Sequence, residues 1–121
     1  MYDLMIEPDD EETEWCWPEV EGALQAIGIP LEGNGCLPGN AEGTVWIDVG
    51  GLDSPCVMLI VVRAKEDSQL ATIRRALDLA FYLADRLSGI VIDVQMGGRI
   101  LPENREWIET EFTGRGSIRQ S

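Results

Sequence analysis

The sequence of 121 residues predicts a single α+β domain, and three patterns along the chain support this fold class. An apolar strand, an amphipathic helix and a second strand follow one another between Cys56 and Gln95. Two further segments, 2–7 and 44–49, alternate apolar and polar residues as half-buried strands do. A short helical stripe at 18–27 lies between these two segments. The predicted order is therefore β-α-β-β-α-β.

The central strand-helix-strand unit carries the strongest pattern. Residues 56–62 are an unbroken apolar run rich in β-branched residues, which is typical of a strand buried on both faces. Between Ser68 and Ser88, apolar residues recur every three or four positions and predict a helix about 30 Å long. Gly89 can take the left-handed conformation just past the helix, and residues 90–95 then form the second strand.

The first half supplies the remaining elements. Pro18 suits the first position of a helix that Gly28 closes, and the glycine-rich stretch 30–43 is expected to be a long loop. Segment 44–49 then pairs with the central strand as an antiparallel hairpin. A short last helix is expected to open at Pro102.

This order of elements is that of the ferredoxin-like arrangement, a four-stranded antiparallel sheet with two helices on one face. We expect residues 1–113 to form the domain and residues 114–121 to be a flexible tail. The opposite face of the sheet is expected to be open and to present nine side chains: Asp3, Met5, Glu7, Thr44, Trp46, Asp48, Val91, Asp93 and Gln95.

The negative charge of the chain is concentrated in its first half. The formal net charge is −13, and thirteen acidic residues but no Lys or Arg precede Arg63. A surface of this sign repels phosphate backbones, so binding to nucleic acid is not expected. It attracts a basic partner protein and accelerates encounter with it. The alternative is that the charge serves only to keep the protein soluble.

The residue types that most enzymes need are sparse. The chain has no histidine, which removes the usual general base and the commonest metal ligand, and its serines lie outside any GxSxG motif. The chain has three cysteines, Cys16, Cys36 and Cys56. No two of them form a CxxC motif, and all three are expected to be reduced thiols. We therefore expect no enzyme, no cofactor and no metal site. With no export signal and no apolar run long enough to cross a membrane, the protein is expected to be cytoplasmic.

A partner-binding site is expected around the acidic run and two of the tryptophans. Trp15 directly follows six residues that include five acids and fits either a partner contact or the core, whereas Trp17 is expected to pack the next helix on the core. Trp46 lies on the expected open face. The proposed contacts are Asp9, Asp10, Glu11, Glu12, Glu14, Trp15, Trp46 and Asp48.

The passage from helix to strand at 76–95, ALDLAFYLADRLSGIVIDVQ, resembles the small immunity proteins that are encoded beside polymorphic bacterial toxins. The resemblance implies a stoichiometric inhibitor that binds its cognate toxin and occludes the active site. Two other hypotheses stay open. One is a homo-oligomeric module, such as a homodimer, that binds a small ligand or regulates an enzyme, and the other is an enzyme using Cys36 or Asp93.

Overall fold

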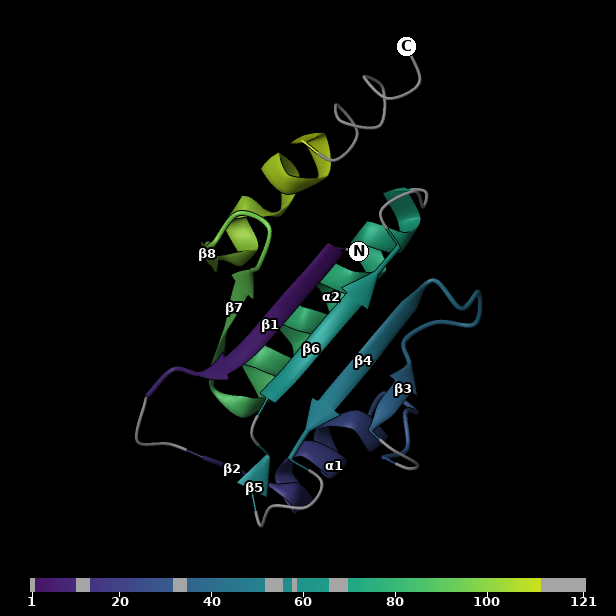
Figure 1. The fold of residues 1–121 in the computed structure, drawn as a ribbon, viewed down its shortest axis with the longest axis vertical. Helices are drawn as coiled ribbons and strands as arrows, with labels where there is room; N and C mark the ends of the chain where they lie inside the picture. The colour runs from purple at the N-terminus through teal and green to yellow at the C-terminus, as the bar shows by residue number, and fades with distance from the viewer. Residues whose placement is uncertain are drawn as a thin grey trace.

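The computed structural model describes residues 2–10, 14–31, 35–51, 56–57, 59–65 and 70–111 (Figure 1). The predicted tail at 114–121 lies outside these residues. Within them, no helix combines the length and the apolar character needed to cross a membrane.

A six-stranded antiparallel sheet forms the body of the molecule, with the strand order β3-β4-β6-β1-β7-β8. Its strands are β1 (Tyr2–Pro8), β3 (Cys36–Pro38), β4 (Val45–Gly50), β6 (Leu59–Ala64), β7 (Gly89–Asp93) and β8 (Gly98–Ile100). A second sheet pairs two short strands, β2 (Trp15–Cys16) and β5 (Cys56–Val57).

Helix α2 (Leu70–Leu87) covers one face of the large sheet, behind β1 and β6 in Figure 1. Its stripe of large apolar residues, which includes Ile73, Leu77 and Leu83, is fully buried, so the helix predicted from the apolar period is confirmed. Helix α1 (Trp17–Gln25) packs mainly against α2 and the two-stranded sheet. A 3₁₀ turn, η1 (Pro102–Asn104), leads into a helix at 105–111.

The prediction of a four-stranded ferredoxin-like sheet with two helices on one face is wrong. The sheet has six strands because β3 and β8, each of three residues, add one strand at each edge. Segments this short carry too few residues for an alternating pattern to show in the sequence. Pro38 ends β3 at the sheet edge, where a missing backbone N–H costs no ladder hydrogen bond.

The predicted outward position of Asp93 is also wrong. Its Cα partner across the sheet is Leu4, and both side chains are buried on the face that α2 covers, Asp93 being only 1 % exposed. The hydroxyl of Tyr2 donates to Asp93 Oδ2 at 2.9 Å, and the backbone N–H of Met96 donates to Oδ1 at 3.1 Å. These hydrogen bonds offset the cost of burying a polar group.

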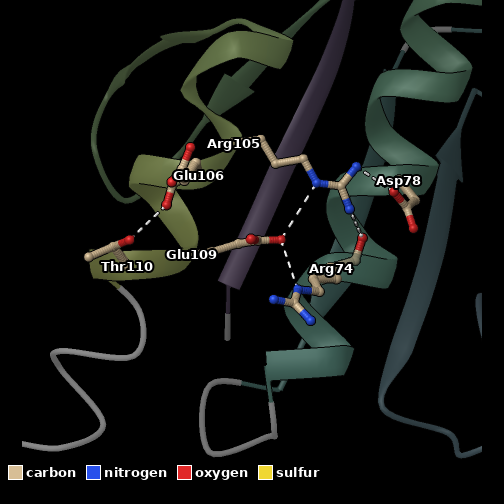
Figure 2. Close-up of polar contacts among 6 residues, drawn as sticks. All are labelled: Arg74, Asp78, Arg105, Glu106, Glu109 and Thr110. Carbon is tan, nitrogen blue, oxygen red and sulfur yellow. Dashed lines mark hydrogen bonds and ion pairs between the residues drawn. The ribbon is translucent and has the colours of Figure 1, made fainter.

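The helix at 105–111 is attached to α2 through a cluster of ion pairs (Figure 2). Glu109 accepts a hydrogen bond from Arg74 Nε at 3.2 Å and lies 3.6 Å from Arg105 Nε. Arg105 also pairs with Asp78 and donates to the backbone oxygen of Arg74 at 3.1 Å. Ile108 packs into the core between these contacts. The helix is therefore held beside the first half of α2.

Candidate functional site

Hydrogen bonds to the C-terminal end of α2 hold the two ends of the acidic run at residues 9–14, which we call the acidic segment. Trp15 Nε1 donates to the carbonyl oxygen of Leu87 at 2.8 Å, and the backbone N–H of Asp9 donates to that of Ser88 at 3.2 Å. Two carbonyls that a helix terminus would leave without partners are thereby satisfied. The two ends of the acidic segment consequently meet at one helix terminus.

The chain leaves α2 through a left-handed residue, but that residue is Ser88, with φ of 52°, and not the predicted Gly89. Gly89 already begins β7, opposite Pro8. A Cβ at Gly89 would lie 2.7 Å from the backbone oxygen of Glu7 and 2.9 Å from Trp15 Cζ2. This position therefore lacks a side chain because the backbone of β1 and an indole ring occupy the space.

Trp15 belongs to the core, since its side chain is only 2 % exposed and its indole N–H is hydrogen-bonded. It has almost no surface to offer a partner. Trp17 is half-buried and packs against the core, as predicted. Of the two possibilities that the sequence left open for Trp15, the structure supports the core position.

Four exposed carboxylates belong to the segments that meet at the end of α2, and we call this surface the acidic end: Asp9, Asp10, Glu14 and Asp85. Asp9 and Asp85 line a common cavity, while Glu14 directly precedes the anchored Trp15. The C-terminus of a helix carries roughly half a negative charge, which adds to their field. Glu11 and Glu12, also predicted as contacts, lie outside the described residues.

The cavity at the acidic end has a volume of about 360 Å³. It is formed by the last turns of α2, the start of β7 and the β8 edge, and its lining combines carboxylates with apolar side chains that include Phe81, Ile90 and Ile100. Arg99 is the one basic residue among those that line it. A long basic side chain fits such a site, because its alkyl stem can pack on apolar groups while its charged head contacts a carboxylate.

Trp46 and Asp48 lie elsewhere, on the face of β4 opposite to the buried side chains of Val45, Ile47 and Val49. Both are half-buried. Asp48 Oδ2 lies 2.5 Å from Arg63 Nε, and Lys65 Nζ lies 6.0 Å from the Trp46 ring. The row through Trp46 and Arg63 continues to Asp3, which is six residues, or about 20 Å of strand, from Asp9. The predicted contacts therefore form two separate groups.

Cys36 is exposed on β3 directly opposite Asp48. The pKa of its thiol is raised above the usual value, first because the Asp48 carboxylate accepts its hydrogen bond, with burial and the negative charge of Asp48 adding to the effect. The raised pKa disfavours the thiolate of Cys36, which is the form that attacks as a nucleophile. The Asp93 carboxylate is held by its hydrogen bonds to Tyr2 and Met96, which engage both of its oxygens.

Replacing Asp48 by asparagine is expected to accelerate alkylation of Cys36 by iodoacetamide about threefold at pH 8. The substitution removes the negative charge that disfavours the thiolate, so the pKa falls and more of the reactive form is present. Mass spectrometry of the Cys36 peptide measures the rate. Asp3→Asn is the matched control, because it removes another carboxylate near Arg63 without facing the thiol. Equal rates in both variants would show that Asp48 does not set this pKa.

No group of three potential metal-binding side chains comes together in the part of the chain that the structure describes. The sequence analysis proposed Asp9, Asp10 and Glu14 as contacts but did not propose Asp85, which lies in α2 and lines the cavity together with Asp9. The cavity depends on α2, β7 and β8 meeting, and no local pattern signals that contact.

Neither the models of known protein families nor the curated proteins compared with this sequence give a match.

Proposed function

We propose that the protein binds a basic partner protein through its acidic end and thereby blocks the partner's active site, as an immunity protein blocks a toxin. The observation that carries this proposal is that Asp9 and Trp15 are hydrogen-bonded to the C-terminal end of α2, where the exposed carboxylates of Asp9 and Asp85 line a common cavity. The resemblance of residues 76–95 to immunity proteins points in the same direction, and these residues include Asp85 and much of the cavity lining.

Three of the described arginines are engaged away from the acidic end, and two others lie near it. Arg63, Arg74 and Arg105 are engaged with acids of the open sheet face, α2 and the helix at 105–111. Arg86 lies 5.9 Å from the Tyr82 ring, and Arg99 lines the cavity. The acidic end therefore keeps a negative potential that steers a cationic surface toward it.

The cavity supplies specificity that charge alone lacks. A Lys or Arg of the partner is expected to enter it, with its alkyl stem against Phe81 and Ile90 and its head between Asp9 and Asp85. Interface energy is concentrated in a few anchors that fill pockets of this kind. Surrounding carboxylates such as Asp10 and Glu14 then mainly affect the rate of association.

Reversing the charge of the acidic end is expected to slow association with the partner at least about tenfold at low salt, with a smaller effect on dissociation. The variant is Asp9→Lys, Asp10→Lys, Glu14→Lys. The ligand is the protein encoded next to this one, and stopped-flow fluorescence measures both rates at several salt concentrations. Co-expression shows whether each variant still protects cells from that protein.

The matched control is Glu103→Lys, Glu106→Lys, Glu111→Lys, which changes the net charge equally on exposed residues at 103–111. A specific acidic end predicts slow association for the first variant and nearly unchanged association for the second. Equal slowing of association in both variants would mean that the effect comes from the overall charge of the protein and not from the acidic end. Unchanged kinetics in both, or no binding and no protection by the native protein, would contradict the proposed function.

A further inference from the structure

Two cysteines face each other across the two-stranded sheet. In the β2–β5 pairing, Cys16 is opposite Cys56 and Trp15 is opposite Val57. Trp15 and Val57 are buried, whereas Cys16 is exposed and Cys56 is partly exposed. Side chains alternate between the faces of a strand, so both thiols lie on the outer face of the pair.

The register sets the distance between them. Directly opposed residues of antiparallel strands have Cα atoms about 4.5 or 5.5 Å apart, depending on the kind of pair. Disulfides accept Cα separations of about 4.4 to 6.8 Å, so either kind of pair falls within this range. Cys16 is also the N-cap residue of α1 but makes no side-chain capping hydrogen bond. Its thiol is therefore not committed to the helix.

We propose that Cys16 and Cys56 form an intramolecular disulfide when the protein meets a low-molecular-weight disulfide such as oxidised glutathione. The Cys16 thiolate attacks one glutathione sulfur, forming a mixed disulfide and expelling one glutathione thiolate. The Cys56 thiolate then attacks the sulfur of Cys16, closing the bond and expelling the second glutathione. The protein dithiol loses two electrons, the small disulfide gains them, and both thiol protons end on the two glutathione molecules.

The surroundings assign the order of attack. The Glu14 carboxylate accepts a hydrogen bond from the Cys56 thiol, and this contact is the main reason that the pKa of Cys56 is raised. Cys16 is the more exposed thiol and attacks first, while Cys56 resolves the mixed disulfide. Closure removes the S–H that Glu14 binds and fixes β2 against β5. The bond therefore links the redox state to the residues that lead into α1, whether or not the proposed partner exists.

Three single substitutions test this inference, because each leaves a different pair of cysteines. Cys36→Ser leaves the opposed pair, whereas Cys16→Ser and Cys56→Ser each leave a pair that includes Cys36 on β3. The full-length proteins are incubated with oxidised glutathione, remaining thiols are alkylated, and intact mass and non-reducing peptide maps are recorded. Amide hydrogen exchange at 15–17 and 56–57 is measured before and after oxidation.

Cys36→Ser is expected to lose both thiols, to gain no glutathione and to yield one cross-linked peptide containing Cys16 and Cys56. Exchange at 15–17 is expected to slow about tenfold in this variant alone. The other two variants are expected to carry glutathione as mixed disulfides. Stable mixed disulfides in Cys36→Ser, or equal closure in all three variants, would overturn the inference.

Discussion

Replacing Trp15 by alanine is expected to lower the free energy of unfolding by about 4 kcal/mol. The side chain is 2 % exposed, so the substitution empties a large volume between the end of α2 and the start of β7. It also removes the N–H donor of the buried Leu87 carbonyl, which then lacks that partner. Equilibrium unfolding in urea, followed by circular dichroism, measures the loss.

Trp107→Ala is the matched control, because the same residue type is 50 % exposed there. Its cost is expected to stay below about 0.5 kcal/mol, as for most surface substitutions. Equal costs for the two variants would contradict the core assignment of Trp15. A negligible cost for Trp15→Ala, together with lost partner binding, would restore the contact role that the sequence also allowed.

The sequence could not decide between these roles for a local reason. Trp15 directly follows an acidic run and belongs to a strand of two residues, too short for any periodic pattern. Its hydrogen-bond partner, Leu87, belongs to a helix far along the chain. Only the fold brings the two together, so burial of this indole is a tertiary property.

Long periodic segments were predicted well because many residues contribute to each pattern. The helix expected at 68–88 is α2, and the strands expected at 2–7 and 44–49 are β1 and β4, the latter paired with β6 as expected. The edge strands β3 and β8 were not predicted, because three residues are too few to define a period. In β7, Ile90, Val91 and Ile92 are all apolar, so the pattern could not say which face Asp93 would share.

The acidic end was predicted only in part. Charge alone placed Asp9, Asp10 and Glu14 on the surface, because isolated carboxylates remain in water. That Asp9 shares a cavity with Asp85 could not be predicted, because it depends on the hydrogen bonds that Asp9 and Trp15 make to the end of α2. Trp46 and Asp48 were expected to join the same site, but strand register places them in the rows of Asp3 and Met5 on β1, away from Asp9.

Replacing Gly89 by alanine is expected to lower the free energy of unfolding by about 3 kcal/mol. The new methyl group would lie 2.7 Å from the Glu7 carbonyl oxygen, which is held in the pairing of β1 with β7. It would also lie 2.9 Å from Trp15 Cζ2. Backbone and ring must both shift, and overpacking of this kind is costly. Thermal and urea unfolding of the variant measure the effect.

Gly22→Ala in α1 is the matched control, because neither glycine has a positive φ and nothing lies within 4 Å of a Cβ at Gly22. There the added methyl group favours the helix and is expected to raise stability by about 0.5 to 1 kcal/mol. The two substitutions are thus expected to change the free energy of unfolding in opposite directions. This difference separates the steric clash at Gly89 from the general effect of replacing glycine by alanine. If both substitutions stabilised the protein, the close contact at Gly89 would be refuted.

The double variant Gly89→Ala, Trp15→Ala isolates the part of the clash that the indole causes. Removing the ring leaves room for the methyl group on that side, while the contact with the Glu7 carbonyl remains. The combined loss is therefore expected to fall short of the sum of the single losses by about 1 kcal/mol. Strict additivity would mean that the Trp15 ring does not limit the space at Gly89, although the hydrogen bond from Trp15 to Leu87 could still hold the indole at the end of α2.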